Sequence, residues 1–378
     1  MDWFARQLLD WFKINGRKDL PWQTDINPYR VWVSEIMLQQ TQVTTVIDYF
    51  NRFTQRFPDI ESLADANLDE VLHLWTGLGY YARGRNLHRS AQLIIKNYEG
   101  QMPRTQEGLE ALSGIGRSTA GAIRAIAMEQ QGVIMDGNVK RILARFHGIE
   151  GYPGENKISA QLWQHAADHT PATHTAAYTQ AIMDIGATLC RRKRPNCADC
   201  PMQTKCVANA EDIVHNLPTP KPKKAKPLRA ARFFIVSLPN GATLMEQRPS
   251  KGLWGGLWNP PERSYEIAIE EYLAELGLDI EAADLHTAKV FRHTFTHFHL
   301  DVEPIYISLK NQPELQGQEL VTRWVLPAQL ENNNEAIGLS AVAVKLLAPL
   351  ATSPNKYGDY AKKPLKDKNQ YEQNGKLQ

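Results

Sequence analysis

All four cysteines of this 378-residue chain, Cys190, Cys197, Cys200 and Cys206, fall within one short segment with the spacing C-x6-C-x2-C-x5-C. Thiols crowded in this way predict a metal centre that pins the segment into a closed loop. A structural zinc ion usually takes two separated C-x2-C pairs, and only one such pair is present. A [4Fe–4S] cluster also takes four thiolates and tolerates longer loops, so the spacing favours the cluster while zinc stays open.

The loop between the first two cysteines carries four consecutive cations, residues 191–194. A charge run of this kind is compatible with a merely solvated surface. Because metal ligands would hold both of its ends, the loop would lose little entropy on docking. We therefore expect it to bind phosphate groups.

The composition is that of an ordinary globular chain. Hydrophobic residues make up 43% and charged residues 22%, which excludes global disorder. No apolar run approaches the roughly 20 residues that span a bilayer. The N-terminus lacks the basic and apolar regions of a secretory signal. Four cysteines are too few for a disulfide scaffold, and we expect a reducing intracellular compartment.

A basic, proline-rich segment divides the chain. Residues 216–231 contain four prolines and no acidic residue. Such a segment cannot bury a core, so we expect an extended linker and favour a spacer over a phosphate-binding role. It would separate a domain at residues 1–215 from a domain at residues 232–351. The polar segment 352–378 is predicted to be disordered.

Hydrophobic periodicity predicts a different secondary structure on each side of the linker. Before it, apolar residues recur at helical spacing from Phe4 to Phe12. Similar spacing occurs at residues 30–50, 65–75, 85–98, 117–128, 138–146 and 156–168. After the linker, β-rich runs at 233–236 and 305–307 alternate with helical stretches near 264–276 and 340–350, which predicts a mixed α/β domain.

A glycine-containing turn precedes one of the expected helices. Gly114 and Gly116 flank a single apolar residue just before residues 117–128. Glycine permits a positive φ and a close approach of the backbone to a ligand. A helix N-terminus presents free N–H groups that favour a phosphate. Taken alone, the turn is equally compatible with a simple helix–helix connection.

Two acidic residues stand in apolar surroundings. Glu35 lies within an apolar helical run, where burial would raise the pKa of its carboxyl and keep it protonated as a general acid. The alternative, which the residues alone favour, is a surface position on an amphipathic helix. Asp136 follows an apolar triplet and precedes Gly137 and Asn138, the pattern of a helix N-cap.

The hairpin, Asp136 and the cysteine pattern, in this order, resemble the helix-hairpin-helix DNA glycosylases related to endonuclease III. Segments 32–42 (WVSEIMLQQTQ), 77–83 (GLGYYAR) and 136–141 (DGNVKR) are similar to the adenine DNA glycosylases of that superfamily. The resemblance runs from about residue 3 to about residue 348. It implies a multidomain chain, with an all-α helix-hairpin-helix domain and a [4Fe–4S] cluster on the four cysteines. An α/β Nudix-like domain would follow.

The resemblance also implies roles for individual residues. Removing adenine requires protonating the base and stabilising an oxocarbenium-like sugar, which suits two carboxylates in different environments. By resemblance, Glu35 protonates adenine N7 and Asp136 stabilises the sugar cation. Contacts with DNA would come from Gln40, Leu78, Tyr80, Gly114, Gly116, Ser118 and Asn138.

Among these contacts, Gln40 and Tyr80 would wedge into the duplex at the mispair, with Leu78 beside them. From the residues alone, Gln40 reads as a helix-surface glutamine and Tyr80 as a core tyrosine. Three arginines at positions 83, 85 and 89 are either a solvated face or phosphate contacts. Glycosylase/lyase relatives carry a lysine where this chain has Ser118, so we expect a monofunctional enzyme that uses water.

Residues 256–278 resemble the Nudix box, G-x5-E-x7-R-E-U-x-E-E-x-G-U, in which U is apolar. The chain departs from it at two positions, because Glu270 replaces the arginine and Ala274 replaces one of the paired glutamates. These losses should cripple a site that holds divalent metal at a pyrophosphate. We therefore expect a Nudix-like fold without hydrolytic activity.

The run of residues 291–299 alternates strictly, which predicts that its histidines and Phe295 share one strand face. The histidines lack a carboxylate or cysteine partner for a convincing metal site. By resemblance, Phe295, Thr296 and His297 form the loop that recognises 8-oxoguanine opposite the adenine, with Thr296 in place of the family's serine.

These expectations converge on a base-excision-repair glycosylase that acts on double-stranded DNA containing A:8-oxoguanine or A:G mispairs. We expect a monomer in a prokaryotic cytoplasm, without a membrane partner. An endonuclease III-type glycosylase/lyase is disfavoured by Ser118. A Nudix pyrophosphohydrolase fused to a DNA-binding module is disfavoured by Ala274. A catalytically silent lesion binder remains the third alternative.

Overall fold

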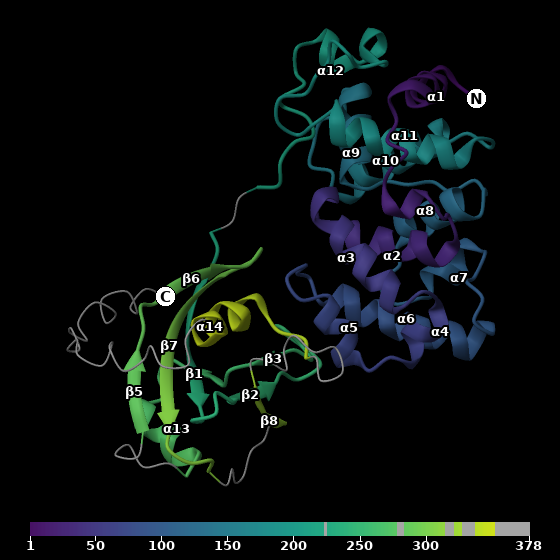
Figure 1. The fold of residues 1–378 in the computed structure, drawn as a ribbon. Coiled ribbons are helices and arrows are strands. Elements are labelled where there is room, and N and C mark those ends of the chain that lie inside the picture. The colour runs from purple at the N-terminus through teal and green to yellow at the C-terminus, as the bar shows by residue number, and fades with distance from the viewer. Residues whose placement is uncertain (223–224, 278–282, 314–320, 327–336, 352–378) are drawn as a thin grey trace. The chain divides into compact units, whose positions relative to one another are not determined.

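The computed structural model describes residues 1–222, 225–277, 283–313, 321–326 and 337–351 (Figure 1). The chain divides into two compact units, and the boundary falls between residues 224 and 225. The tail at 352–378, for which disorder is predicted, lies outside the described residues. In the part of the chain that is described, no helix is long and apolar enough to cross a membrane.

The first unit is helical, as the sequence predicts. Its α-helices are α1 Trp3–Asn15, α2 Pro28–Leu38, α3 Val43–Arg56, α4 Ile60–Asp65, α5 Leu68–Leu74, α6 Ala82–Tyr98, α7 Gln106–Glu110, α8 Arg117–Ala127, α9 Gly137–Phe146, α10 Asn156–His169, α11 Thr175–Thr188 and α12 Val207–Ala210. Two 3₁₀ turns, Pro21–Gln23 and Gln203–Lys205, complete it.

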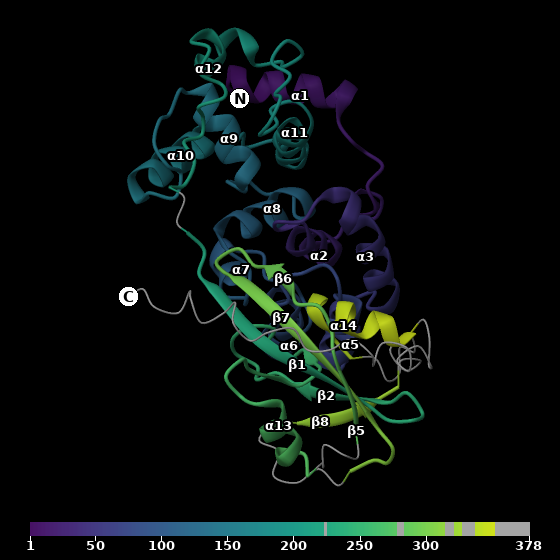
Figure 2. The ribbon, with the colours of Figure 1, turned by 90° about the vertical axis from the view of Figure 1, so that its left-hand side faces the viewer.

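Helix α2 lies at the centre of the first unit. It begins cleanly because Asn27 caps it, accepting a hydrogen bond from the Arg30 N–H at 2.9 Å, and because Pro28 occupies its first position. Trp32 and Val33 are fully buried. A helix that is buried around most of its circumference belongs in a core. It contacts α3, α6 and α8 (Figure 2).

The first helix of the chain packs with late helices rather than with α2. Helix α1 lies against α11, and both lie on the side of the unit that also holds α9 and α10 (Figures 1 and 2). Arg17, which follows α1, forms an ion pair with Asp184 of α11, in which its Nε and Nη2 both donate to the Asp184 Oδ1, at 3.0 and 2.6 Å. Asp184 is 1% exposed, so this pair holds the two ends of the unit together.

The apolar pattern at 30–50 predicts continuous helical spacing, and the structure corrects it. Helix α2 ends at Leu38, and α3 starts only at Val43. Gln40 adopts a left-handed φ of +59°, which an α-helix cannot continue through. A turn closed by the Thr41 N–H and the Leu38 carbonyl at 3.2 Å replaces the expected helix there.

In its described residues, the second unit is a mixed sheet with two helices, which confirms the predicted α/β class. Its elements are β1 Leu228–Ser237, β2 Thr243–Gln247, β3 Trp258–Asn259, β4 Glu262–Ser264, α13 Ile269–Glu275, β5 Ala283–Thr287, β6 Phe291–Thr294, β7 His299–Leu309, β8 Thr322–Val325 and α14 Ala341–Ala351. The main path runs β3-β2-β1-β7-β5, and β4, β6 and β8 pair with β1, β7 and β2.

The central strands β1 and β7 run parallel, whereas their other neighbours are antiparallel. Residues 233–236 of β1 are buried on both faces, as is usual for parallel strands covered by helices. One face packs against α13 through Phe234 and Tyr272, whose rings stack 4.0 Å apart. Tyr306 of β7 donates a hydrogen bond to the Leu346 carbonyl of α14 at 3.0 Å.

Three boundaries in the second unit differ from those expected. Strand β1 starts at Leu228, inside the segment assigned to the linker, because it pairs with the beginning of β7. The helix expected near 264–276 is shorter, since residues 262–264 pair with β1 as strand β4. The alternating run 291–299 is not one strand: β6 and β7 form a hairpin, closed by the Phe295 N–H and the Phe298 carbonyl at 2.9 Å.

Candidate active site and nucleic-acid interface

Glu35 and Asp136 line the same cavity, of about 330 Å³, in the helical unit. The cavity lies between α2, the start of α8, the start of α9 and one side of α11. Its walls also include Ser118 and Asn138, two of the predicted DNA contacts. The remaining lining residues are Arg17, Leu20, Trp22, Leu38, Gln39, Thr41, Val43, Thr119, Ala122, Ile134, Gln180, Met183, Asp184 and Ala187.

Glu35 is not a surface glutamate. It projects from α2 into the cavity, and its helical neighbours Ile36 and Met37 are buried. Burial raises the pKa of the Glu35 carboxyl from 4.5 to about 8, and the negative charge of Asp136 adds to the effect. Glu35 therefore holds a proton at neutral pH, as a general acid requires.

Asp136 is the N-cap of α9, as predicted. Its Oδ1 accepts hydrogen bonds from the backbone N–H groups of Asn138 at 3.0 Å and Val139 at 2.8 Å. Burial raises the pKa of the Asp136 carboxyl, whereas these two N–H groups and the charges of Arg141 and Lys140 oppose the rise. The helix N-terminus favours the charged form, so the two carboxyls of the cavity have different environments.

The glycine turn joins α7 to α8. Gly114 has a φ of +83° and Gly116 caps α8 without any side-chain hydrogen bond to its first turn. Both glycines are exposed, so the first N–H groups of α8 face outward without a side-chain cap. Ser118 instead turns toward the cavity, where its Oγ accepts a hydrogen bond from the Met135 N–H at 2.9 Å.

The two predicted wedge residues protrude from separate loops. Gln40 is exposed between α2 and α3, and Tyr80 is 44% exposed between α5 and α6. Tyr80 is therefore not the core tyrosine that its residue type alone suggests. Both have a left-handed backbone, with φ of +59° and +49°. Leu78, in the same loop as Tyr80, is different, because only 6% of it is exposed.

Arg83 is the functional candidate that the sequence reasoning missed. Its position among three arginines suggests a solvated face or phosphate contacts, but only 8% of it is exposed. The signal was present in the periodicity, since Arg83 is in phase with the buried residues Leu87, Ala91 and Ile94 of α6.

The four cysteines are unpaired thiols that line one small cavity of about 30 Å³ next to α9. Among the described residues, no three His, Cys, Asp or Glu side chains converge closely enough to hold a single metal ion. Four thiols lining one cavity are the donor set that an iron–sulfur cluster takes. Arg145 faces these thiols, with its Nη1 3.3 Å from the Cys190 Sγ, and would offset the charge of thiolates.

The basic loop after Cys190 is exposed at residues 191–194 and is anchored at its start. The Arg141 Nε donates to the Cys190 carbonyl at 2.7 Å, and the Arg145 Nη1 donates to the Arg191 carbonyl at 2.9 Å. The loop thus begins from the same helix, α9, that Asp136 caps.

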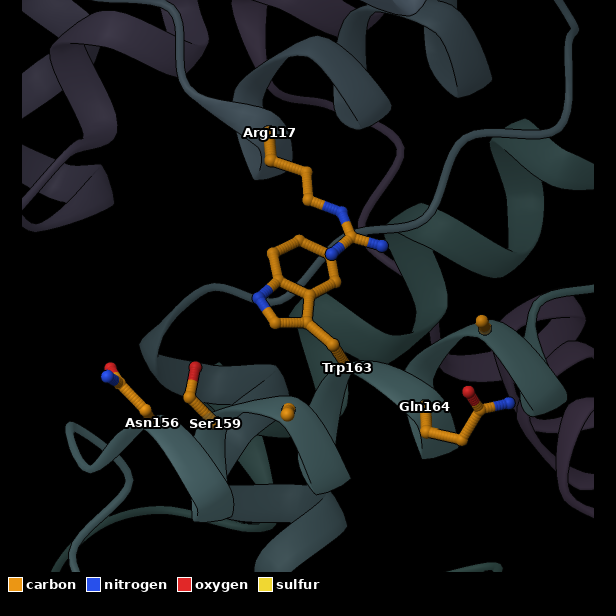
Figure 3. Close-up of a pocket in the computed structure, with 7 residues that line it drawn as sticks. Arg117, Asn156, Ser159, Trp163 and Gln164 are labelled. Carbon is orange, nitrogen blue, oxygen red and sulfur yellow. The ribbon is translucent and has the colours of Figure 1, made fainter.

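A shallow depression of about 400 Å³ lies between the start of α8 and α10. The guanidinium of Arg117 stacks on the indole of Trp163, 4.0 Å from the ring centroid (Figure 3). Asn156, Ser159 and Gln164 lie around this pair (Figure 3). Neither carboxylate lines the depression, so it is separate from the cavity of Glu35 and Asp136.

In the second unit, the predicted recognition residues form the turn between β6 and β7. Phe295 is half-buried, and its ring stacks on Phe298 at 4.4 Å and lies 5.4 Å from Trp254. Thr296 and His297 are exposed at the tip of the turn. Lys226 donates from its Nζ to the Phe295 carbonyl at 2.7 Å, which ties the turn to the segment before β1.

Two of the acidic residues left in the Nudix-like motif are ion-paired with arginines. Glu262 contacts Arg248 at 3.3 Å, and Glu275 contacts Arg263 at 3.6 Å. Arg263 also makes a bidentate pair, at 2.8 and 2.9 Å, with Glu246, which is 2% exposed. Fixed cations therefore lie where a pyrophosphohydrolase would need carboxylates free for a divalent metal.

Comparison with known proteins gives matches to both units. Residues 33–167 match the HhH-GPD superfamily of base excision DNA repair proteins, and residues 232–348 match the NUDIX domain. The adenine DNA glycosylase of Buchnera aphidicola subsp. Schizaphis graminum is 39% identical over 344 residues, which cover 91% of this chain and 97% of that protein.

More distant relatives match over most of the chain. The human adenine DNA glycosylase is 34% identical over 382 residues, covering 85% of this chain and 70% of the human protein. Among solved structures, a thermostable thymine-DNA glycosylase has a TM-score of 0.51 at 24% identity. The match covers 55% of this chain and 95% of that chain, which shows a shared fold.

Proposed function

The chain belongs to the adenine DNA glycosylase family of base-excision repair enzymes, and from that membership we propose that its cavity removes adenine mispaired with 8-oxoguanine or guanine in duplex DNA. The observation that carries this proposal is the shared cavity of Glu35 and Asp136. A protonated carboxyl beside a carboxylate capped by N–H groups suits cleavage of an N-glycosidic bond.

In the proposed reaction, Glu35 supplies the proton. With a pKa of about 8, its carboxyl is mostly protonated at neutral pH, yet it is acidic enough to donate to a ring nitrogen of adenine, which we assign as N7. Protonation weakens the bond between the base and the sugar, and the leaving adenine departs without a full negative charge.

Asp136 acts on the sugar by stabilising its positive charge. As the base departs, positive charge develops on the sugar ring, and a carboxylate that is already oriented stabilises it without reorganisation. The two N–H groups at the start of α9 hold Asp136 in place. Water then completes hydrolysis. Ser118 stands in the cavity wall at the position where glycosylase/lyase relatives carry a lysine, and no lysine is among the described residues that line the cavity, so the proposed enzyme is monofunctional.

The target adenine must leave the base stack before it can enter the cavity, which costs a few kcal/mol. We assign the wedge to Gln40 and Tyr80, because both protrude from the helical unit on fixed loops. Leu78, which is buried in the loop that carries Tyr80, would support that loop. The uncapped start of α8, with Gly114 and Gly116, would bind backbone phosphate. Ser118 and Asn138 would contact the nucleotide inside the cavity.

The thiols of Cys190, Cys197, Cys200 and Cys206 line one cavity and would hold a [4Fe–4S] cluster, which their spacing in the sequence favours over a single zinc ion. We give the cluster a structural role: when bound, it holds both ends of the basic loop at residues 191–194 in place. That loop would then bind DNA phosphate with little loss of entropy.

The second unit would recognise the opposite base. Phe295 is anchored by Phe298 and Trp254, whereas Thr296 and His297 present a hydroxyl and an imidazole at an exposed tip. These two groups can hydrogen-bond an oxidised guanine, which we infer to be their ligand. The ion-paired carboxylates of the Nudix-like motif support the loss of pyrophosphate hydrolysis.

Single-turnover cleavage of labelled duplexes tests the proposal. We expect strand breaks at adenine opposite 8-oxoguanine and opposite guanine only after hot alkali, because a monofunctional enzyme leaves an intact abasic site. A thymine-glycol duplex and a nucleoside diphosphate linked to a second group serve as controls, and neither should react. Breaks at thymine glycol without alkali would instead indicate the lyase branch.

A further inference from the structure

Arg83, in the first turn of α6, is buried, yet it donates hydrogen bonds to two different loops. Its Nη1 lies 2.6–2.9 Å from three acceptors and its Nη2 lies 3.0–3.4 Å from three more. These acceptors are the carbonyls of Ile36, Met37, Gln39, Leu78 and Gly79 and the hydroxyl of Thr41.

No carboxylate of the described chain forms an ion pair with this guanidinium. Its charge is instead balanced by backbone oxygens, including the last carbonyls of α2, where the helix dipole favours a cation. Desolvation lowers the pKa of Arg83 to about 10, so the group stays charged at neutral pH. A buried cation is costly unless it is hydrogen-bonded, and Nη1 and Nη2 of Arg83 find their acceptors in both loops, whereas its Nε has no partner among the described residues.

The two loops carry the protruding residues Gln40 and Tyr80. Both residues have a left-handed φ, a conformation that costs a non-glycine residue about 1–2 kcal/mol and persists only where the surroundings hold it. Arg83 binds the oxygens on each side of Gln40, and those of the two residues before Tyr80. It also lies 5.5 Å from the ring centroid of Tyr80.

We propose that Arg83 is a positioning residue that joins the Gln40 and Tyr80 loops into one rigid wedge, so that both side chains enter the duplex together. The inference rests on the proposed wedge role of these two residues. Without the bridge, each loop would have to be ordered separately on binding, and that ordering would reduce the free energy available for extruding the base.

Only arginine has the shape for this task. Its planar fork presents two nitrogens with separate sets of acceptors: Nη1 contacts the end of α2 and Gln39, and Nη2 contacts the Thr41 hydroxyl and the Tyr80 loop. A lysine at the same position keeps the charge, but its donors all lie on one atom, so it cannot reach the acceptors of both arginine nitrogens. The Arg83→Lys variant therefore separates the charge from the bridge.

The test uses the full-length protein with 2-aminopurine in place of the target adenine, because the fluorescence of this base rises when it unstacks. Stopped-flow mixing measures the rate of this fluorescence rise. A separate assay measures single-turnover excision of normal adenine from two duplexes. In one, adenine is mispaired with 8-oxoguanine. In the other, it lies in an unpaired loop, where no wedge is needed. Lys96→Gln, an exposed charge on the same helix, is the matched control.

For Arg83→Lys we expect the rate of fluorescence rise and the excision rate at the mispair to fall about tenfold, equivalent to about 1.4 kcal/mol. Excision from the unpaired loop should stay near the wild-type rate, and Lys96→Gln should match wild type throughout. General damage to the fold would lower the excision rate on both duplexes by the same factor. If Arg83→Lys is insoluble, Thr41→Val removes one acceptor of the bridge. Because Thr41 also lines the cavity, its readout is the ratio of the excision rate at the mispair to that in the unpaired loop, which should fall by less than tenfold.

Two results would overturn the inference: equal rates for Arg83→Lys and wild type at the mispair, or equal losses on both duplexes. Failure of the proposed function is distinguishable from either. In that case the wild-type protein itself would show no excision of the mispaired adenine, whatever residue stands at position 83.

Discussion

The charge of Asp136 reinforces burial in raising the pKa of Glu35 to about 8, because both carboxyls face one cavity. Asp136 is itself held at the N-terminus of α9 by two backbone N–H groups. Glu35 is therefore the protonated acid of the cavity, and Asp136 is its anion. This division has consequences that can be measured in solution.

The excision rate should depend on pH and should fall at alkaline pH. Glu35 must be protonated to act, so the single-turnover rate should be highest below pH 8 and fall about tenfold per pH unit well above it. A rate profile from pH 5 to 10 on the A:8-oxoguanine duplex measures this. A rate that keeps rising through pH 9 would contradict the role of Glu35 as an acid.

The matched variant is Glu35→Gln, which cannot ionise. The folded-state pKa of Glu35 lies above the value of 4.5 for an exposed carboxyl, so the stability it contributes is present below pH 4.5 and is lost as the pH rises toward 8. Glu35→Gln should therefore stabilise the protein relative to wild type at pH 8.5 but not at pH 4. Urea unfolding at both values gives the comparison.

Asp136→Asn should retain binding to product-like DNA and lose most excision. Asparagine is a good N-cap, so α9 should keep its start, but the amide cannot stabilise a sugar cation. We expect the single-turnover rate to fall by about 10²–10³. Asp136→Ala adds about 1 kcal/mol of destabilisation through the lost cap. Wild-type excision by Asp136→Asn would remove this residue from the mechanism.

The two hairpin glycines should respond differently to alanine. Gly114 has a φ of +83° and an added Cβ would lie 3.0 Å from Asn86, so Gly114→Ala should lose about 1–2 kcal/mol of stability. Gly116 has open space around it, and Gly116→Ala should cost only about 0.5 kcal/mol. There the Cβ would obstruct a phosphate, so we expect DNA affinity to fall about tenfold.

Thermal unfolding and fluorescence anisotropy with a short duplex measure the two effects separately. If Gly116→Ala binds the duplex as wild type does, the start of α8 does not contact phosphate.

Removal of the metal centre should weaken DNA binding more than chemistry. Cys197→Ser removes one of the four thiols, so the basic loop at residues 191–194 would no longer be held at both ends. We expect lower affinity, with the log–log salt slope reduced by about one for each phosphate that the loop no longer binds. Excision at saturating protein should change little. An iron-free variant that binds duplex as tightly as wild type does would contradict this prediction.

The buried pair of Arg17 and Asp184 should be sensitive to the loss of one partner. Arg17→Met leaves the Asp184 carboxylate buried with only part of its hydrogen bonds, at a cost of about 3 kcal/mol in the free energy of unfolding. The double variant Arg17→Met/Asp184→Asn removes the charge and should recover part of that loss. Urea denaturation of wild type and both variants tests this. If Arg17→Met unfolds with the same free energy as wild type, the ion pair does not stabilise the fold.

Local spacing was sufficient for much of this protein. The cysteine segment, the cap at Asp136, the apolar setting of Glu35 and the change from helical to mixed α/β texture were all predictable. Each depends on neighbours within a few residues, where helix periodicity, capping and ligand spacing act. The continuous helix through 30–50 was wrong because apolar spacing does not register the left-handed backbone of Gln40.

Tertiary packing decided which of these groups meet. Glu35 and Asp136 are 101 residues apart in sequence, and only the packing of α2 against α8, and of α11 against α8 and α9, brings them to one cavity. Tertiary packing also determines the partners of Arg83, because its acceptors come from the end of α2 and from the loop before α6. The burial of a charged side chain and the choice of its partners depend on long-range contacts, which local spacing does not encode.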